Sequence, residues 1–189
     1  MTKVAVILTQ GFADWEYALI AGTGGPYYGL DVQFFTPEVG EVRSFGGLVA
    51  VVNQGFELIA EWAPTVVVVV GGNIWMSSEA PDISELLKSY HSNGGTVAGI
   101  CGGTLAIARA GLLNDVLHTS NDADFLSQNA KGYSGTDSFR KSCSAVSDKG
   151  VITAPPTAPV SFTAAILESA GINEETVLQF RNMMAAEHA

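Results

Sequence analysis

Residues 96–108 read Thr96-Val97-Ala98-Gly99-Ile100-Cys101-Gly102-Gly103-Thr104-Leu105-Ala106-Ile107-Ala108. An apolar strand is followed by two glycines and a helix-forming run, with Cys101 at the corner. A cysteine placed there lies near the positive end of the helix dipole and near backbone N–H groups that lack helical partners, and both favour thiolate over thiol. The arrangement has the form of a nucleophile elbow with cysteine in place of serine, so Cys101 is predicted to be a nucleophile.

On both sides of residues 96–108, strand-like and helix-like runs alternate, which is typical of a parallel sheet with helices on both faces. Gly24-Gly25-Pro26 is expected to interrupt or end the first helix. Short β-branched runs from Val42 to Val52 flank Gly46-Gly47 and predict a small hairpin attached to the edge of the main sheet. Strands are predicted at 4–8, 32–35, 65–70, 96–100, 117–120 and 150–153, and helices at 14–21, 82–91, 103–110, 160–170 and 174–186.

These elements predict an α/β fold, a flavodoxin-like three-layer αβα sandwich with a mostly parallel central sheet and a small hairpin. The chain of 189 residues is 47% apolar and has no linker-like tract, so we expect a single domain over residues 1–189. The carboxyl ends of parallel strands lie at one sheet edge, where ligands bind in open α/β folds. The Gly71-Gly72 loop and Cys101 are therefore candidates for one pocket.

The amino-acid composition of the chain excludes some classes of binding partner and cofactor. The formal charge of -10, from 19 acidic and 9 basic residues, argues against nucleic acid and anionic membranes and favours small molecules or proteins as partners. The two cysteines give no disulfide framework, and Cys143 is expected to be a small buried hydrophobe. The chain begins in a strand pattern without a signal peptide, so we expect a cytoplasmic protein. No metal-ligand spacing or nucleotide motif is present, so we expect no metal and no cofactor.

Five segments, in this order, resemble one known family. They are Gly11-Phe12-Ala13-Asp14-Trp15-Glu16, the run from Val66 to Asn73, Ala98-Gly99-Ile100-Cys101-Gly102-Gly103, Leu117-His118-Thr119-Ser120-Asn121, and Val151 to Pro159. On these motifs the chain is identified as a member of the ThiJ/PfpI superfamily, the cysteine branch of the class I glutamine amidotransferase-like fold. The similarity covers essentially the whole chain.

The resemblance implies that Cys101 is the reactive cysteine and Glu16 the acid that faces its sulfur. The amides of Gly72 and Gly102 would be the oxyanion donors, since two N–H groups aimed at one point stabilise a negative oxygen. A carboxylate beside a thiolate repels it, so one of the pair should hold a proton. A protonated Glu16 would donate a hydrogen bond to sulfur and favour thiolate. Further residues expected around the pocket are Asp14, Trp15, Gly71, Asn73, Ser120 and Asn121.

Simpler interpretations stand beside these roles. Asp14 and Trp15 are expected to be structural. Alternatively, Trp15 lines the mouth of the pocket. The two glycines at 71 and 72 would serve equally to end a strand. Asn121 is expected either to orient a ligand or, with Asp122, to cap the following helix.

The chain departs from the family's histidine patterns. Gly102 stands where the protease-like branch has a histidine directly after the cysteine, and Ser120 stands where the branch nearest the parkinsonism protein has one. His118 lies two positions earlier and would reach the pocket only if the strand bends or its register shifts. As a strand residue with satisfied ring nitrogens it would be structural instead. Residues 153–159 lack the His-x-Glu pair of true glutaminases, so a Cys-His-acid triad is not predicted.

The leading hypothesis is a cysteine-dependent hydrolase or lyase, and not a protease or glutaminase of the usual kind. It would act on a small electrophilic or amide-like metabolite through a covalent adduct on Cys101. The alternative is a non-enzymatic protein that responds to oxidative stress, with an oxidant converting Cys101 to a sulfinate. A third is a module that binds a carboxylate or an aldehyde without catalysis. The resemblance also implies a homodimer.

Overall fold

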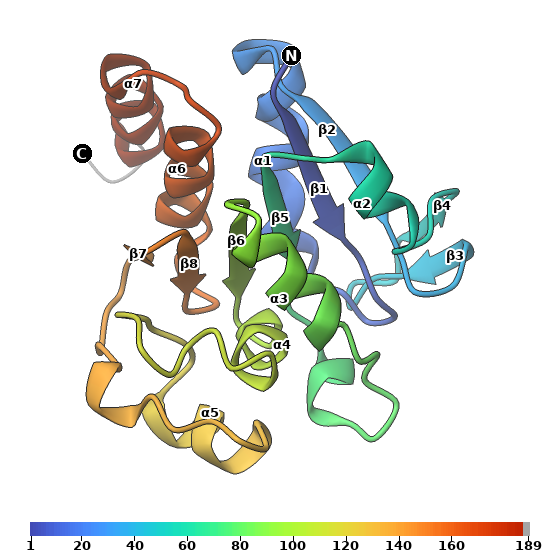
Figure 1. The fold of residues 1–189 in the computed structure, drawn as a ribbon. Coiled ribbons are helices and arrows are strands. Elements are labelled where there is room, and N and C mark those ends of the chain that lie inside the picture. Colours follow the sequence, from blue (N-terminus) through green and yellow to red (C-terminus); the bar gives the residue numbers. More distant parts are fainter. Residues whose placement is uncertain (187–189) are drawn as a thin grey trace.

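The computed structural model describes residues 1–186 and shows a six-stranded sheet between two helical layers (Figure 1). The strand order is β2-β1-β5-β6-β8-β7, and every neighbouring pair is parallel except β7 with β8. The bounds of the strands are β1 Lys3–Ile7, β2 Asp31–Phe35, β5 Val66–Val69, β6 Thr96–Ile100, β7 Val146–Asp148 and β8 Val151–Ala154.

Two clusters of buried apolar side chains lie on opposite faces of this sheet. Val4 and Val6 of β1 belong to one cluster, and Ala5 and Ile7 belong to the other, because successive side chains of a strand point to opposite faces. Helices α1 Asp14–Tyr28, α6 Pro159–Ser169 and α7 Glu174–Ala185 cover the first face; α2 Leu58–Trp62, α3 Ser84–Ser92, α4 Gly103–Arg109 and α5 Ala123–Asn129 cover the second. The predicted three-layer αβα sandwich of flavodoxin-like type is confirmed.

The position of the site follows from two central strands. All four residues of β5 are fully buried, as expected for a β-branched strand covered on both faces. Val69 of β5 is paired with Gly99 of β6, so both strands end at the same edge. The loop at Gly71 and Gly72 therefore lies beside Cys101, as the sequence predicts.

The hairpin forms, but it is not attached to the main sheet as expected. Strands β3 Gly40–Arg43 and β4 Val49–Val52 make a separate two-stranded antiparallel sheet. Val42 and Val52 are buried in the core on the α1 side, which anchors the hairpin by packing rather than by a ladder. An isolated bridge between Phe12 and Ser44 joins its tip to the loop after β1.

The first helix runs through Gly24-Gly25-Pro26, so the expectation that these residues end it is wrong. A Cβ on Gly24 would lie 2.8 Å from Val32 Cγ2, so the glycine lets the helix pack closely against β2. The helix ends only at Gly29, whose φ of 65° is left-handed and whose N–H donates to the Gly25 carbonyl. This is the usual glycine stop of a helix.

Residues 117–120 do not form the predicted strand. The only pairing described for this segment is an isolated bridge between His118 and Phe139. Strand β7, helix α2 and the 3-10 turns η1 Asn73–Met76 and η2 Thr136–Ser138 were not predicted, whereas α5 is the helix expected after Asp122, although its bounds were not predicted. Within residues 1–186, no helix is both long enough and apolar enough to cross a membrane.

Candidate active site

Cys101 occupies a tight corner between β6 and α4. Its φ is 52°, a left-handed backbone conformation that few residues other than glycine adopt. Its N–H donates to the Ala154 carbonyl of β8 at 2.9 Å. Its own carbonyl accepts from the N–H of Thr104 at 3.1 Å and from Thr104 Oγ1 at 2.6 Å. The corner is therefore fixed from both sides, which is the geometry of a nucleophile elbow.

Three glycines allow this corner to pack directly against the sheet. A Cβ on Gly103 would overlap the Val69 carbonyl oxygen, and one on Gly99 would lie 2.6 Å from Ile107 Cδ1. A Cβ on Gly102 would lie 2.7 Å from the Gly72 carbonyl oxygen. The glycines around Cys101 are thus required by close approach of α4 to the strands and to the neighbouring loop.

Glu16 lies in the first turn of α1, and its side chain is almost fully buried at 1% exposure. Its Oε2 accepts a hydrogen bond from the Gly71 N–H at 2.8 Å, and its Oε1 has no partner among the residues described. Burial raises the pKa of Glu16 to about 7, against smaller lowering contributions from the Gly71 amide and the Cys101 thiol. Near neutral pH this carboxyl group can therefore both take up and release a proton.

The thiol of Cys101 is less acidic than the elbow alone predicts. Burial, and then the negative charge of Glu16, raise the pKa of Cys101 to about 11, although the Gly102 amide and Asn121 lower it. Asn121 Nδ2 lies 3.7 Å from Sγ. The expectation that the helix terminus would favour thiolate is corrected here: α4 is short, and burial beside a carboxylate outweighs it.

The amides of Gly72 and Gly102 lie close together at the mouth of the elbow. The Ala13 N–H donates to the Gly71 carbonyl, which pairs the Gly71-Gly72 loop with the loop after β1. Within the described chain, no backbone carbonyl accepts the N–H of Gly72 or of Gly102. A Cβ on Gly102 would lie 2.7 Å from the Gly72 carbonyl oxygen and 3.2 Å from the Gly72 nitrogen, so the two glycines are in close contact. Their role as oxyanion donors stays a prediction.

A cavity of about 180 Å³ opens over the sulfur. Its lining includes seven of the residues expected from sequence, and among the described residues that line it Cys101 and Glu16 are the ionisable ones. It is too small for a drug-sized ligand, since such pockets hold about 300–1,000 Å³. The lining residues are Gly11, Ala13, Trp15, Glu16, Phe45, Gly72, Asn73, Met76, Cys101, Gly102, Asn121 and Phe125.

The structure does not bring His118 to Cys101. The ring is fully buried, with Nδ1 2.8 Å from the Val116 carbonyl oxygen and Nε2 2.7 Å from the Tyr133 hydroxyl. It packs edge-on against Tyr133 and Phe139. The catalytic hypothesis for His118 is thereby corrected: no strand forms here, and both ring nitrogens are already used within the core.

Three other expected pocket residues support the site from outside the cavity. Ser120 is buried, and its Oγ lies 2.7 Å from Thr104 Oγ1, whose own proton goes to the Cys101 carbonyl. Ser120 therefore donates to Thr104 and, through Thr104, stabilises the backbone at Cys101. Asp14 Oδ2 accepts from the Gly46 N–H at 2.7 Å and ties the hairpin tip to α1. Gly71 holds Glu16 rather than facing a ligand.

Sequence reasoning missed the apolar walls of the cavity. Phe45 comes from the β3–β4 loop, Met76 from η1 and Phe125 from α5. Nothing in the local pattern assigns Phe45 or Met76 to a pocket, because each reaches it through tertiary packing. Phe125 was more accessible to prediction, since a cap at Asp122 places it in the first turn of a helix beside Asn121. Cys143 is exposed, so its expected burial is wrong.

Arg109 is a further residue near the site that no sequence motif indicates. Its guanidinium Nη2 donates to the Trp75 carbonyl at 2.6 Å and to the Asn129 carbonyl at 2.9 Å. Trp75 belongs to η1 and Asn129 to α5, so this side chain of α4 joins two walls of the cavity to the elbow helix. Charged donors to carbonyls are among the stronger hydrogen bonds.

Removal of the N-cap of α5 is expected to destabilise this helix, which carries Phe125. Asp122 Oδ1 accepts from the Phe125 N–H at 2.7 Å, so Asp122→Ala should lower the free energy of unfolding in urea by about 1 kcal/mol. Asp122→Asn keeps an equivalent oxygen and should retain most of that stability. Equal losses in the two variants would show that the cap is not responsible.

The buried His118 is expected to stay neutral in the folded protein below its ordinary pKa of 6.5. Burial lowers the pKa of this ring, so the unfolded chain binds a proton at a higher pH than the folded one. The free energy of unfolding should therefore lose a contribution as the pH falls below about 6.5. NMR titration of the ring protons measures this directly, and a midpoint at or above 6.5 would contradict it.

Comparison with known proteins agrees with this architecture. The sequence profile of the DJ-1/PfpI family matches residues 2–169. The crystal structure of a DJ-1 superfamily protein from Agrobacterium tumefaciens is 36% identical, with a TM-score of 0.94 and coverage of 100% of both chains. YdeA of Bacillus subtilis, named an uncharacterized protease, is 30% identical over 171 residues, or 89% of this chain and 83% of its own.

Drosophila melanogaster DJ-1beta shares the fold, with a TM-score of 0.78, 23% identity and coverage of 97% of both chains. The resemblance to the ThiJ/PfpI superfamily seen in the five sequence motifs is thus confirmed. The chain, with its elbow cysteine on a parallel α/β sheet, belongs to the DJ-1/PfpI family.

Proposed function

We propose that the protein is a cysteine-dependent enzyme that acts on small, uncharged carbonyl compounds through a covalent adduct on Cys101. One observation carries the proposal. The cavity over the sulfur is small and has largely apolar walls, yet it combines a thiol, two glycines whose N–H groups donate to no backbone carbonyl within the described chain, and a carboxyl group whose pKa burial raises to about 7. No lysine or arginine lines it, so it offers no counter-ion for a charged reacting group.

The reaction would begin with transfer of the thiol proton of Cys101 to the Glu16 carboxylate as sulfur attacks the carbonyl carbon. The S–C bond forms, and the carbonyl electron pair moves onto oxygen, where the amides of Gly72 and Gly102 would stabilise the charge. With an acyl substrate, the intermediate collapses, and the leaving group departs with the proton from Glu16. Water then hydrolyses the thioester, again with Glu16 as the proton acceptor.

The raised pKa of Cys101 fits this order of events. A neutral thiol beside a carboxylate is stable at rest, and the proton moves only when an electrophile is bound. No histidine contributes, since His118 is held in the core.

Acetyl transfer from p-nitrophenyl acetate tests the proposal. Intact-protein mass spectrometry should show an acetyl adduct on the wild type and on Cys143→Ser, the matched control at an exposed cysteine. Cys101→Ser should show none and should lose the catalysed release of nitrophenolate. Equal turnover by Cys101→Ser and the wild type would overturn the assignment.

A second function, a response to oxidative stress without turnover, is supported by the donors around the sulfur. Peroxide would oxidise the thiolate to a sulfenate and then to a sulfinate, releasing one water at each step. The Gly102 amide and the Asn121 side chain would stabilise the added oxygens. Mild peroxide followed by peptide mass spectrometry distinguishes it: preferential sulfinate on Cys101 supports the role, and equal oxidation of Cys143 contradicts it.

A further inference from the structure

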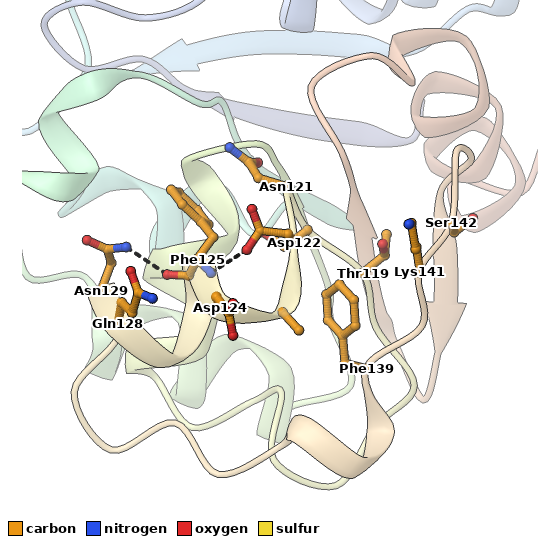
Figure 2. A pocket seen from close by; sticks show the side chains of 12 residues that line it. Thr119, Asn121, Asp122, Asp124, Phe125, Gln128, Asn129, Phe139, Lys141 and Ser142 are labelled. Carbon is orange, nitrogen blue, oxygen red and sulfur yellow. Dashed lines mark hydrogen bonds between the residues drawn. The ribbon is translucent and has the colours of Figure 1, made fainter.

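A second and larger cavity adjoins the one over Cys101. It has a volume of about 700 Å³, and two residues, Asn121 and Phe125, line both cavities. Figure 2 shows its walls: α5 with Gln128 and Asn129 lies on one side, and Phe139 with Lys141 lies on the other. The full lining is Thr119, Ser120, Asn121, Asp122, Ala123, Asp124, Phe125, Gln128, Asn129, Phe139, Lys141 and Ser142.

This larger cavity is rich in hydrogen-bonding side chains that the protein itself does not use. In the part of the chain that the structure describes, the side chains of Gln128 and Lys141 and the carboxylate of Asp124 take part in no hydrogen bond. Phe125 and Phe139 add two aromatic rings (Figure 2). These three polar side chains are exposed on the walls of the cavity, and polar groups beside aromatic surface are typical of a ligand site.

The charges of the lining select an uncharged ligand. Lys141 would attract an anion, but Asp122 and Asp124 line the same cavity and would repel it. A cationic ligand would be attracted by the two carboxylates but repelled by Lys141, and the net charge of -10 further disfavours anions. Hydroxyl groups both donate and accept, so they can bond to ammonium, amide and carboxylate alike.

We propose that this cavity binds the non-reacting part of the substrate, and that the substrate is an uncharged, polyhydroxylated carbonyl compound such as a short open-chain sugar. The proposal rests on the function proposed above for Cys101. Asn121 stands at the junction, with its Nδ2 3.7 Å from Sγ and its side chain in both linings. A carbonyl carbon at the sulfur would therefore direct an attached hydroxylated chain past Asn121 toward Gln128 and Lys141.

With an aldehyde, the covalent step is addition alone. The bond from Cys101 sulfur to the carbonyl carbon forms, the carbonyl π bond breaks, and the thiol proton reaches the new oxygen through Glu16. The product is a reversible hemithioacetal, and no oxidant or leaving group is needed.

Two aldehydes of equal length, D-erythrose and butanal, test the proposal. Each is added to the full-length protein, and protection of Cys101 from iodoacetamide is measured by peptide mass spectrometry. N-acetylcysteine treated in the same way corrects for the different reactivity of the two aldehydes. After this correction, erythrose should protect Cys101 at about tenfold lower concentration than butanal, an effect expected of one or two added hydrogen bonds.

Variants of the cavity residues test whether this cavity causes the preference for erythrose over butanal. Lys141→Ala and Gln128→Ala should reduce the corrected preference toward one, whereas Lys131→Ala, the same change outside the cavity, should keep it. Equal protection of the wild type by erythrose and butanal would overturn this inference and leave the proposed function standing. Failure of both aldehydes to protect Cys101, while iodoacetamide still labels it, would overturn the proposed function and this inference together.

Discussion

Glu16→Gln is expected to make the protein more stable than the wild type by about 3 kcal/mol at about pH 9. The pKa of Glu16 is raised from 4.5 to about 7 in the folded state because the carboxyl group is buried. Between these two values the unfolded chain has released the proton and the folded protein has not. Each unit of difference corresponds to about 1.4 kcal/mol, so ionisation of Glu16 costs the folded state about 3 kcal/mol.

The stability of the wild type should depend on pH, because the pKa of Glu16 is higher in the folded protein than in the unfolded chain. Since the folded pKa is raised, the wild type should lose stability as the pH rises from about 5 through 7, and then reach a plateau. Glutamine imitates the protonated acid and can still accept from the Gly71 N–H, so the variant should lack this loss. Urea unfolding at about pH 5 and pH 9 measures the difference. Glu41→Gln, at an exposed position of β3, is the control, and parallel pH profiles for Glu16→Gln and the wild type would refute the prediction.

Gly103→Ala is expected to destabilise the protein by about 3 kcal/mol. The new Cβ would overlap the Val69 carbonyl oxygen and lie 2.9 Å from the carbonyl carbon of the same residue. Both groups belong to the fully buried strand β5, so α4 must move away from the sheet. Overpacking of a rigid core costs about 1–3 kcal/mol, and a clash with backbone lies at the upper end. The same movement would displace Cys101 and reduce its acetylation.

Gly22→Ala is the matched control for this change. Gly22 is exposed within α1, and a Cβ there meets no atom within 4 Å. Alanine favours the helix over glycine, so this variant should gain about 0.5–1 kcal/mol in the same urea measurement. If both alanines were neutral or both stabilising, close packing of α4 on β5 would not be the reason for Gly103.

The layered fold could be predicted because its strongest signals are local. The β-branched run at 65–70 and the strand before Cys101 each specify a buried strand by composition alone, and their ends lie at one edge of the sheet. The errors arose where tertiary packing overrides local preference. Gly24 does not stop α1, because the close approach of Val32 makes a glycine favourable inside that helix. The hairpin is held by Val42 and Val52 in the core, which no local pattern reveals.

For the site, the strand end at Cys101 and the family resemblance identified the central residues. Cys101, Glu16, Gly72 and Gly102 come together as expected, although their chemical roles stay predictions. His118 was misplaced because the expected strand is replaced by a single bridge to Phe139. The acidity of Cys101 was also misjudged, since burial beside Glu16 depends on packing that the sequence does not show.

Several expectations from the sequence stay predictions. They concern the single domain over residues 1–189, the homodimer, the cytoplasmic location and the small-molecule partner. Within residues 1–186 no group of three or more histidine, cysteine, aspartate or glutamate side chains is placed to hold a metal ion.

Trp15 gives the protein an optical reporter at the entrance to the cavity. Its indole Nε1 donates to the Pro156 carbonyl at 3.0 Å, which fixes the ring, while about half of the side chain (48%) is exposed. Of the three tryptophans, Trp15 is the one that lines this cavity, whereas Trp75 is fully buried. A ligand that displaces water from the Trp15 ring should shift the emission of that indole. Binding at Cys101 can therefore be followed by intrinsic fluorescence, without a label and without turnover.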